Sequence, residues 1–131
     1  MADEKSKGGA MVWGGRVLSA LVVAFMAMDA TMKLMVMPIV VETGKTLGWG
    51  PGTAFPLGII LLVSTLLYAI PQTSVLGAIL LTGYLGGAEA THMRVGSPAF
   101  SYAFGAGLGV MVWGGLFLRD PRVRALIPLR R

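Results

Sequence analysis

The run Gly58-Ile-Ile-Leu-Leu-Val-Ser-Thr-Leu-Leu-Tyr-Ala-Ile70 sets the fold class of this 131-residue chain. It lacks the polar stripe at 3.6-residue spacing that a helix of a soluble bundle carries, and it is apolar on every side. Such a helix is typical of a membrane span. Three more apolar stretches of the chain are long enough, or nearly so, to cross a hydrocarbon core of ~30 Å.

The composition agrees with this assignment. Hydrophobic residues make up 55% of the chain and charged residues 13%, and the mean hydropathy is +0.74, whereas a soluble domain carries about 25% charged residues. We therefore expect an all-α, integral membrane, four-helix transmembrane bundle over residues 11–118. The expected spans are about 11–37, 55–70, 74–93 and 100–118, with an outer loop at 38–54 and basic tails at 1–10 and 119–131.

The distribution of basic residues predicts the orientation. Eight lysines and arginines lie in or next to the two tails, and the segments that would face the other side hold only Lys45 and Arg94. By the positive-inside rule, both termini face the cytoplasm. The net charge of +5 is therefore a feature of the membrane topology that favours contact with lipid headgroups, and it does not indicate nucleic-acid binding.

Aromatic residues are expected to mark the two membrane interfaces, where amphipathic rings are favoured. Near the inner interface we place Trp13, Tyr68 and Trp113. Near the outer one we place Trp49, Phe55, Phe100 and Tyr102.

Small residues four apart predict where helices approach closely. The third span carries Gly83 and Gly87, and the fourth carries Gly105 and Gly109. These strips predict close packing within the chain. A homodimer interface through one of them is the alternative.

Four ionisable residues inside the spans lie near one depth in the membrane. Asp29 on the first span and Glu89 on the third each lie ~9 Å above the midplane, with Lys33 and His92 about one turn further out. Ionisable groups inside a membrane mark a functional site by default, so these residues predict a small cavity that opens outward. The alternative is structural: Asp29 neutralises Lys33, and Glu89 with His92 sets the helix register.

Metal binding is not expected. The chain has no cysteine and one histidine, which excludes Cys-ligated clusters and a bis-histidine haem within one chain. The pairs Met26/Met28 and Met35/Met37 do not form a copper site, because residues two apart on a helix do not share a face.

The polar residues lie in two segments, Asp29-Ala-Thr-Met-Lys-Leu34 and Leu81-Thr-Gly-Tyr-Leu-Gly-Gly-Ala-Glu-Ala-Thr-His-Met-Arg94. Both segments resemble the DoxX-like family of small bacterial membrane proteins. The resemblance implies a four-helix bundle in the bacterial cytoplasmic (inner) membrane. The matching site positions are Lys33, Glu89, Thr91, His92 and Arg94.

Relatives in this family are associated with quinone-linked oxidation and with membrane oxidoreductase complexes. The resemblance therefore implies an accessory or quinone-associated subunit, with a quinone as candidate cofactor and oxidoreductase subunits as candidate partners. The residues themselves supply no redox centre, so catalysis by this chain alone stays open. Two alternatives are a membrane scaffold or assembly factor, and a small proton- or solute-conducting protein.

Overall fold

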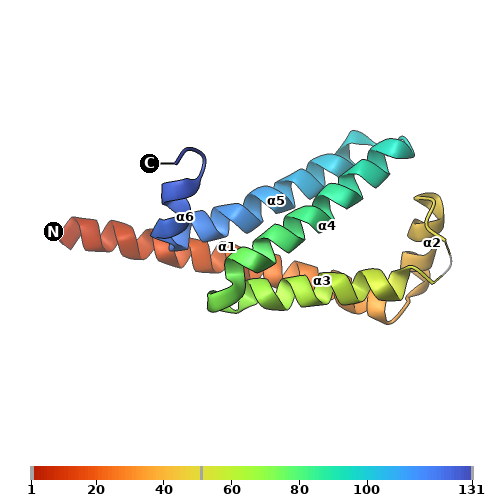
Figure 1. The fold of residues 1–131 in the computed structure, drawn as a ribbon, viewed down its shortest axis with the longest axis horizontal. Coiled ribbons are helices and arrows are strands. Elements are labelled where there is room, and N and C mark those ends of the chain that lie inside the picture. The colour runs from red at the N-terminus through yellow and green to blue at the C-terminus, as the bar shows by residue number, and fades with distance from the viewer. Residues whose placement is uncertain (1, 51, 131) are drawn as a thin grey trace.

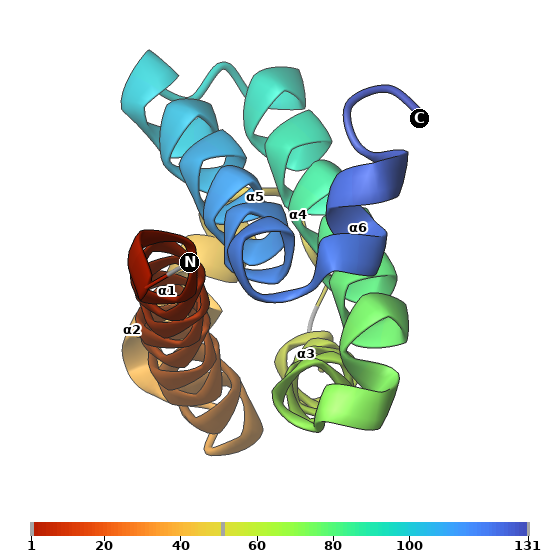
Figure 2. The same ribbon diagram turned by 90° about the vertical axis from the view of Figure 1, so that its left-hand side faces the viewer.

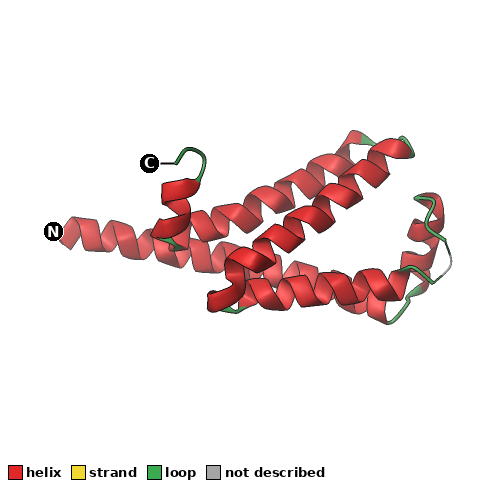
Figure 3. Cartoon of the chain, viewed as in Figure 1, coloured by secondary structure: helices red, strands yellow, loops and turns green. Residues whose placement is uncertain are grey.

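The computed structural model describes residues 2–50 and 52–130, and within these ranges every regular element is helical. This confirms the all-α prediction. Figures 1 and 3 show the chain, which is ordered as follows: α1 (Ala2–Leu34), α2 (Pro38–Thr46), α3 (Ala54–Ala69), the 3-10 helix η1 (Pro71–Thr73), α4 (Ser74–Arg94), α5 (Ala99–Arg119) and α6 (Pro121–Leu126).

The four longer helices pack side by side in a ring. α1 contacts α3 and α5, and α4 contacts the same two helices, so that α1 and α4 occupy opposite corners. Figure 2 shows this ring from the end at which both chain termini lie. In Figure 1 the pair α4–α5 diverges from the pair α1–α3 toward the end that carries α2.

Among the residues that the structure describes, two helical segments are long and apolar enough to cross a membrane: Gly8–Leu34 and Ala99–Arg119. Helices α3 and α4 pass the same test only as a pair, which is bent by 111° at the break between them. Length and composition thus support two spans, or three if the bent pair counts as one. Helix α3 by itself has only 16 residues, fewer than the ~20 that cross a bilayer without tilt or thinning.

Two segments expected to be a loop and a tail contain helices. Within 38–54, α2 begins at Pro38, a residue that favours the first helical position because its ring presets φ. The turn that follows uses Gly48 and Gly52, whose φ values of +84° and +82° favour glycine. At the other end of the chain, α6 occupies Pro121–Leu126 within the predicted basic tail.

The glycines that bring helices together are not the ones that the spacing predicted. A Cβ added at Gly15 would lie 2.7 Å from the carbonyl oxygen of Gly115, so α1 and α5 nearly touch there. A Cβ at Gly77 would overlap the backbone of Tyr68, which closes the α3–α4 corner.

In contrast, a Cβ at Gly83, Gly87 or Gly109 would meet no described atom of another helix within 4 Å. At Gly105 the nearest atoms belong to the Glu89 side chain. The predicted intrachain packing at Gly83, Gly87 and Gly109 is therefore wrong. Spacing identifies a smooth strip on a helix, but the rotation of that helix in the bundle decides what the strip faces. Dimer formation through these glycines stays a prediction.

Tyr68 is also placed differently from the prediction of an interfacial ring. Its side chain is fully buried. Its hydroxyl donates a hydrogen bond of 2.7 Å to the carbonyl of Val112 on α5 and lies 3.1 Å from the hydroxyl of Ser19 on α1. One phenol thus joins α1, α3 and α5, because its hydroxyl finds protein partners at the point where these helices meet.

Candidate ligand cavity

A cavity of about 950 Å³ lies between the helices at the end of the bundle that carries α2. Residues from α1, α2, α3, α4, α5 and the turn after α2 line it. Much of the wall is apolar. Phe25 of α1 and Phe104 of α5 both face it, and their rings meet edge to face with centroids 5.4 Å apart.

Five of the six predicted site residues line this cavity. They are Asp29, Lys33, Glu89, Thr91 and His92. The first two come from α1 and the other three from α4, so residues 56 or more positions apart in the chain share one space.

Asp29 and Lys33 form an ion pair within α1. The Lys33 ammonium donates to Asp29 Oδ1 at 2.7 Å, and the two residues are one helical turn apart. The Lys33 side chain keeps 18% of its surface exposed and that of Asp29 keeps 32%. Each charge of the pair therefore has its partner within α1, and both side chains still border the cavity.

Tyr84 is a cavity residue that the sequence reasoning missed. The Lys33 ammonium lies 6.0 Å from the centroid of the Tyr84 ring, at the edge of cation–π range. Helical periodicity could have found it: Tyr84 lies two turns before His92, so both residues occupy the same side of α4. A single tyrosine in an apolar helix does not by itself indicate a functional site.

Glu89 and His92 border the cavity without joining the pair on α1. The Glu89 side chain lies against the backbone of α5 at Gly105. His92 Nδ1 lies 2.9 Å from the Ser97 hydroxyl, a local contact in which the tautomer sets the donor. Among the described side chains, no hydrogen bond links these two residues to Asp29 or Lys33. The Asp29–Lys33 contact fits the first part of the structural alternative, and the described contacts show no hydrogen bond between Glu89 and His92 for its second part.

The sixth predicted residue, Arg94, lies outside the main cavity. Its Nη2 donates to the Leu47 carbonyl at 3.0 Å and thereby ties the turn after α2 to the end of α4. Arg94 also borders a smaller cavity of about 280 Å³, which shares Trp49 and Thr91 with the larger one. Thr91 itself donates to the Gly87 carbonyl at 2.8 Å.

The half of the bundle away from α2 is closed by packing. Val22, Leu61 and Leu81 are fully buried there, as is Val112. The Tyr68 hydroxyl network lies at the same end of the bundle. The cavity therefore does not continue through this packed core.

The described residues hold no group of three histidine, cysteine, aspartate or glutamate side chains that could hold a metal ion. The cavity itself presents ammonium, phenol, carboxyl, imidazole and hydroxyl side chains beside apolar walls, a lining of the kind that small-molecule sites have.

The model of the DoxX-like family matches residues 17–115. The chain belongs to the DoxX-like family. The matched range begins within α1 and ends within α5, so it includes all residues of the DoxX-like protein that line the cavity. No match was found among the curated proteins or among the solved structures.

Proposed function

We propose that this DoxX-like protein crosses the bacterial cytoplasmic membrane four times with both termini in the cytoplasm, and that it holds a quinone headgroup as an accessory subunit of a membrane oxidoreductase system. In this topology the cavity lies near the outer leaflet. The cluster of basic residues near both chain ends supports the orientation.

One observation carries the proposal: the cavity combines apolar walls with a small set of polar groups on two facing helices. A quinone needs flat apolar contact for its ring and tail, and donors for its two carbonyl oxygens. Phe25, Phe104 and Leu108 supply the first kind of surface. Lys33 on α1 and His92 on α4 can supply the second.

The accessory role follows from the residues available in this chain. It has no cysteine and a single histidine, so electrons for a bound quinone would come from a partner subunit. The protein would then contribute a binding site and a position in the membrane.

A scaffold without a ligand is the second candidate, and the Asp29–Lys33 bond of 2.7 Å favours it, because a closed pair needs no ligand. A proton conductor is less well supported, since the buried layer around Leu61, Leu81 and Val112 interrupts any polar path from the cavity to the other end.

Fluorescence of Trp49 tests the quinone proposal, since this indole lines the cavity. A short-chain ubiquinone titrated into the purified protein in mild detergent should quench Trp49 saturably, and Trp49→Phe should remove that component. Lys33→Met and His92→Ala should each weaken binding about 10-fold or more, the usual effect of losing a charge-assisted hydrogen bond.

Arg122→Gln, at the opposite end of the bundle, is the matched control and should bind like the parent protein. Quenching that is non-saturable, or that is equal in the Lys33→Met and His92→Ala variants and the parent, would reject the proposal. In that case the scaffold candidate takes its place.

A further inference from the structure

The end of the bundle opposite the cavity carries a surface of exposed arginines and exposed large apolar side chains. Figure 1 shows that the N-terminal part of α1 and all of α6 lie at this end. We call it the basic end surface, and it consists of Trp13, Arg16, Arg122, Leu126, Leu129 and Arg130.

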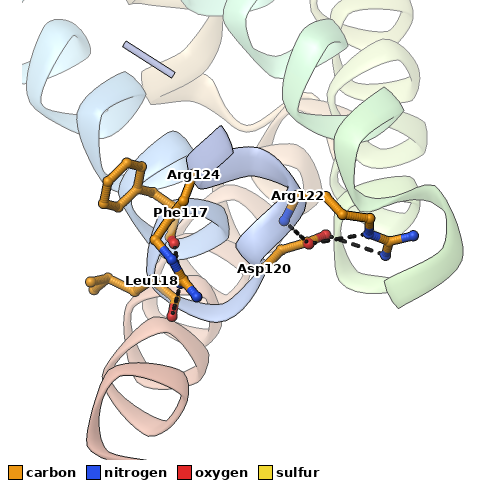
Figure 4. A network of polar contacts seen from close by, with 5 residues as sticks. All are labelled: Phe117, Leu118, Asp120, Arg122 and Arg124. Carbon is orange, nitrogen blue, oxygen red and sulfur yellow. Dashed lines mark hydrogen bonds and ion pairs between the residues drawn. The ribbon is translucent and has the colours of Figure 1, made fainter. Parts of the chain in front are cut away.

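The chain makes a sharp corner between α5 and α6, and local hydrogen bonds hold it. Figure 4 shows the contacts of Asp120 and Arg124 that form it. Asp120 caps α6 by accepting the Arg122 backbone N–H at 2.9 Å. Arg124 Nη1 donates to the Phe117 carbonyl at 2.7 Å and to the Leu118 carbonyl at 3.0 Å, which satisfies the C-terminal end of α5.

The corner places α6 across the long axis of the bundle, as Figures 1 and 2 show. Val123 packs inward and is only 5% exposed, which anchors the helix to the bundle. A short helix in this position would lie parallel to the surface of a membrane that α1 and α5 cross.

The exposed side chains of this end are apolar and basic together. Leu126 and Leu129 are 61% and 76% exposed, and Trp13 is 66% exposed. Arg16, Arg122 and Arg130 are also exposed, while Asp120 is the acid held in the corner. Exposed leucine and tryptophan favour the interfacial layer of a bilayer, and arginine favours anionic headgroups.

We infer that the basic end surface binds anionic phospholipid headgroups, with Leu126 and Leu129 inserted among the acyl chains. The arginines supply the charge complementarity. Helix α6 carries Arg122 and Leu126 across the long axis of the bundle (Figure 1), and Leu129 and Arg130 follow directly after it. This binding is separate from the cavity at the other end and does not depend on its ligand.

The absence of cysteine from the chain allows a direct depth measurement. A spin label on Leu129→Cys would be compared in nanodiscs of phosphatidylcholine alone and of phosphatidylcholine mixed with phosphatidylglycerol. With the anionic lipid present, the label should become more accessible to oxygen and less accessible to an aqueous nickel complex. A label on Thr46→Cys, exposed on α2 at the opposite end, should show the same accessibility in both.

Adding Arg16→Gln and Arg130→Gln should abolish the difference between the two lipids. In native mass spectrometry the same double variant should retain phosphatidylglycerol about 25-fold more weakly, at about fivefold for each arginine near an anionic surface. Circular dichroism would establish that it keeps the parent helix content. A Leu129→Cys label that is equally open to nickel in both membranes, or a double variant that keeps the lipid difference, would overturn the inference.

Discussion

The Lys33 ammonium lies 6.0 Å from the centroid of the Tyr84 ring, and this contact joins α1 to α4 across the cavity. These helices occupy opposite corners of the ring and pack mainly through their shared neighbours, α3 and α5. Lys33 therefore has two roles: it closes an ion pair with Asp29 on its own helix, and it reaches toward the facing one.

A double-mutant cycle measures this contact. Tyr84→Leu and Lys33→Met should each lower the free energy of unfolding, and together they should lower it by less than the sum. The expected coupling is about 0.5–2 kcal/mol, the range of cation–π pairs from exposed to desolvated sites. Thermal unfolding in mild detergent gives the four values. Strictly additive effects would show that the two side chains are only neighbours.

Tyr68→Phe should destabilise the closed end of the bundle. The substitution removes the hydroxyl that donates to Val112 and contacts Ser19 while it keeps the ring. The expected loss is about 0.6–2 kcal/mol, the usual range for hydrogen bonds between membrane helices. Tyr102→Phe is the control, because the described contacts give its hydroxyl no hydrogen bond, and its unfolding temperature should not change. Equal unfolding temperatures for both variants would contradict the role of the Tyr68 network.

Two glycines on α4 should respond to alanine in opposite ways. Gly77→Ala pushes a methyl group into the Tyr68 backbone, and overpacking of this kind costs about 1–3 kcal/mol or more. Gly83→Ala meets no described atom of another helix within 4 Å, and the gain in helix propensity should stabilise by about 0.5–1 kcal/mol. Thermal unfolding of the two variants decides the point. A Gly83→Ala variant as unstable as Gly77→Ala would mean that Gly83 is covered, as it would be in a dimer.

The corner before α6 should loosen in acid. Partial burial opposes the charge on Asp120, but the backbone N–H and the guanidinium of Arg122 outweigh it and lower the pKa of Asp120 below its ordinary value of 3.8. A carboxyl whose pKa is lower in the folded than in the unfolded protein stabilises the fold at pH values above its unfolded pKa. This contribution is lost as the pH falls through the folded pKa. A spin label on Ala125→Cys should therefore gain mobility at pH values below the folded pKa of Asp120.

Asp120→Asn provides the matched control for this titration. The amide can still accept the Arg122 N–H as a helix cap, but it carries no charge to titrate. The label in this variant should keep the same mobility across the acid range. A transition at the same pH in both proteins would assign the loosening to another group.

Arg94→Gln should free the turn that follows α2. The guanidinium holds the Leu47 carbonyl at 3.0 Å, so its loss should raise deuterium uptake across residues 47–53. Lys45→Gln is the control, since its contact with Glu42 is long at 3.9 Å and highly exposed and therefore stabilises little. Unchanged uptake in Arg94→Gln would show that other contacts hold the turn.

The candidate site was partly predictable from the sequence. Asp29 and Lys33 are four residues apart and must share a helix face, and Glu89 and His92 stand out as ionisable groups in an apolar helix. Periodicity places Tyr84 on the His92 side of α4, but its contact with Lys33 depends on how α1 and α4 are placed around the cavity. For Arg94, the sequence could not show that its guanidinium reaches the Leu47 carbonyl instead of the main cavity.

Composition and hydropathy alone establish that the chain is helical and apolar enough for a membrane, because burial of backbone polar groups in lipid leaves few other solutions. The packing of the helices decides the rest: which glycines touch, where Tyr68 finds its partners, and how far apart α1 and α4 stand around the cavity. Spacing along one helix sets which residues share a face. Only the rotation of that helix against its neighbours sets what the face meets.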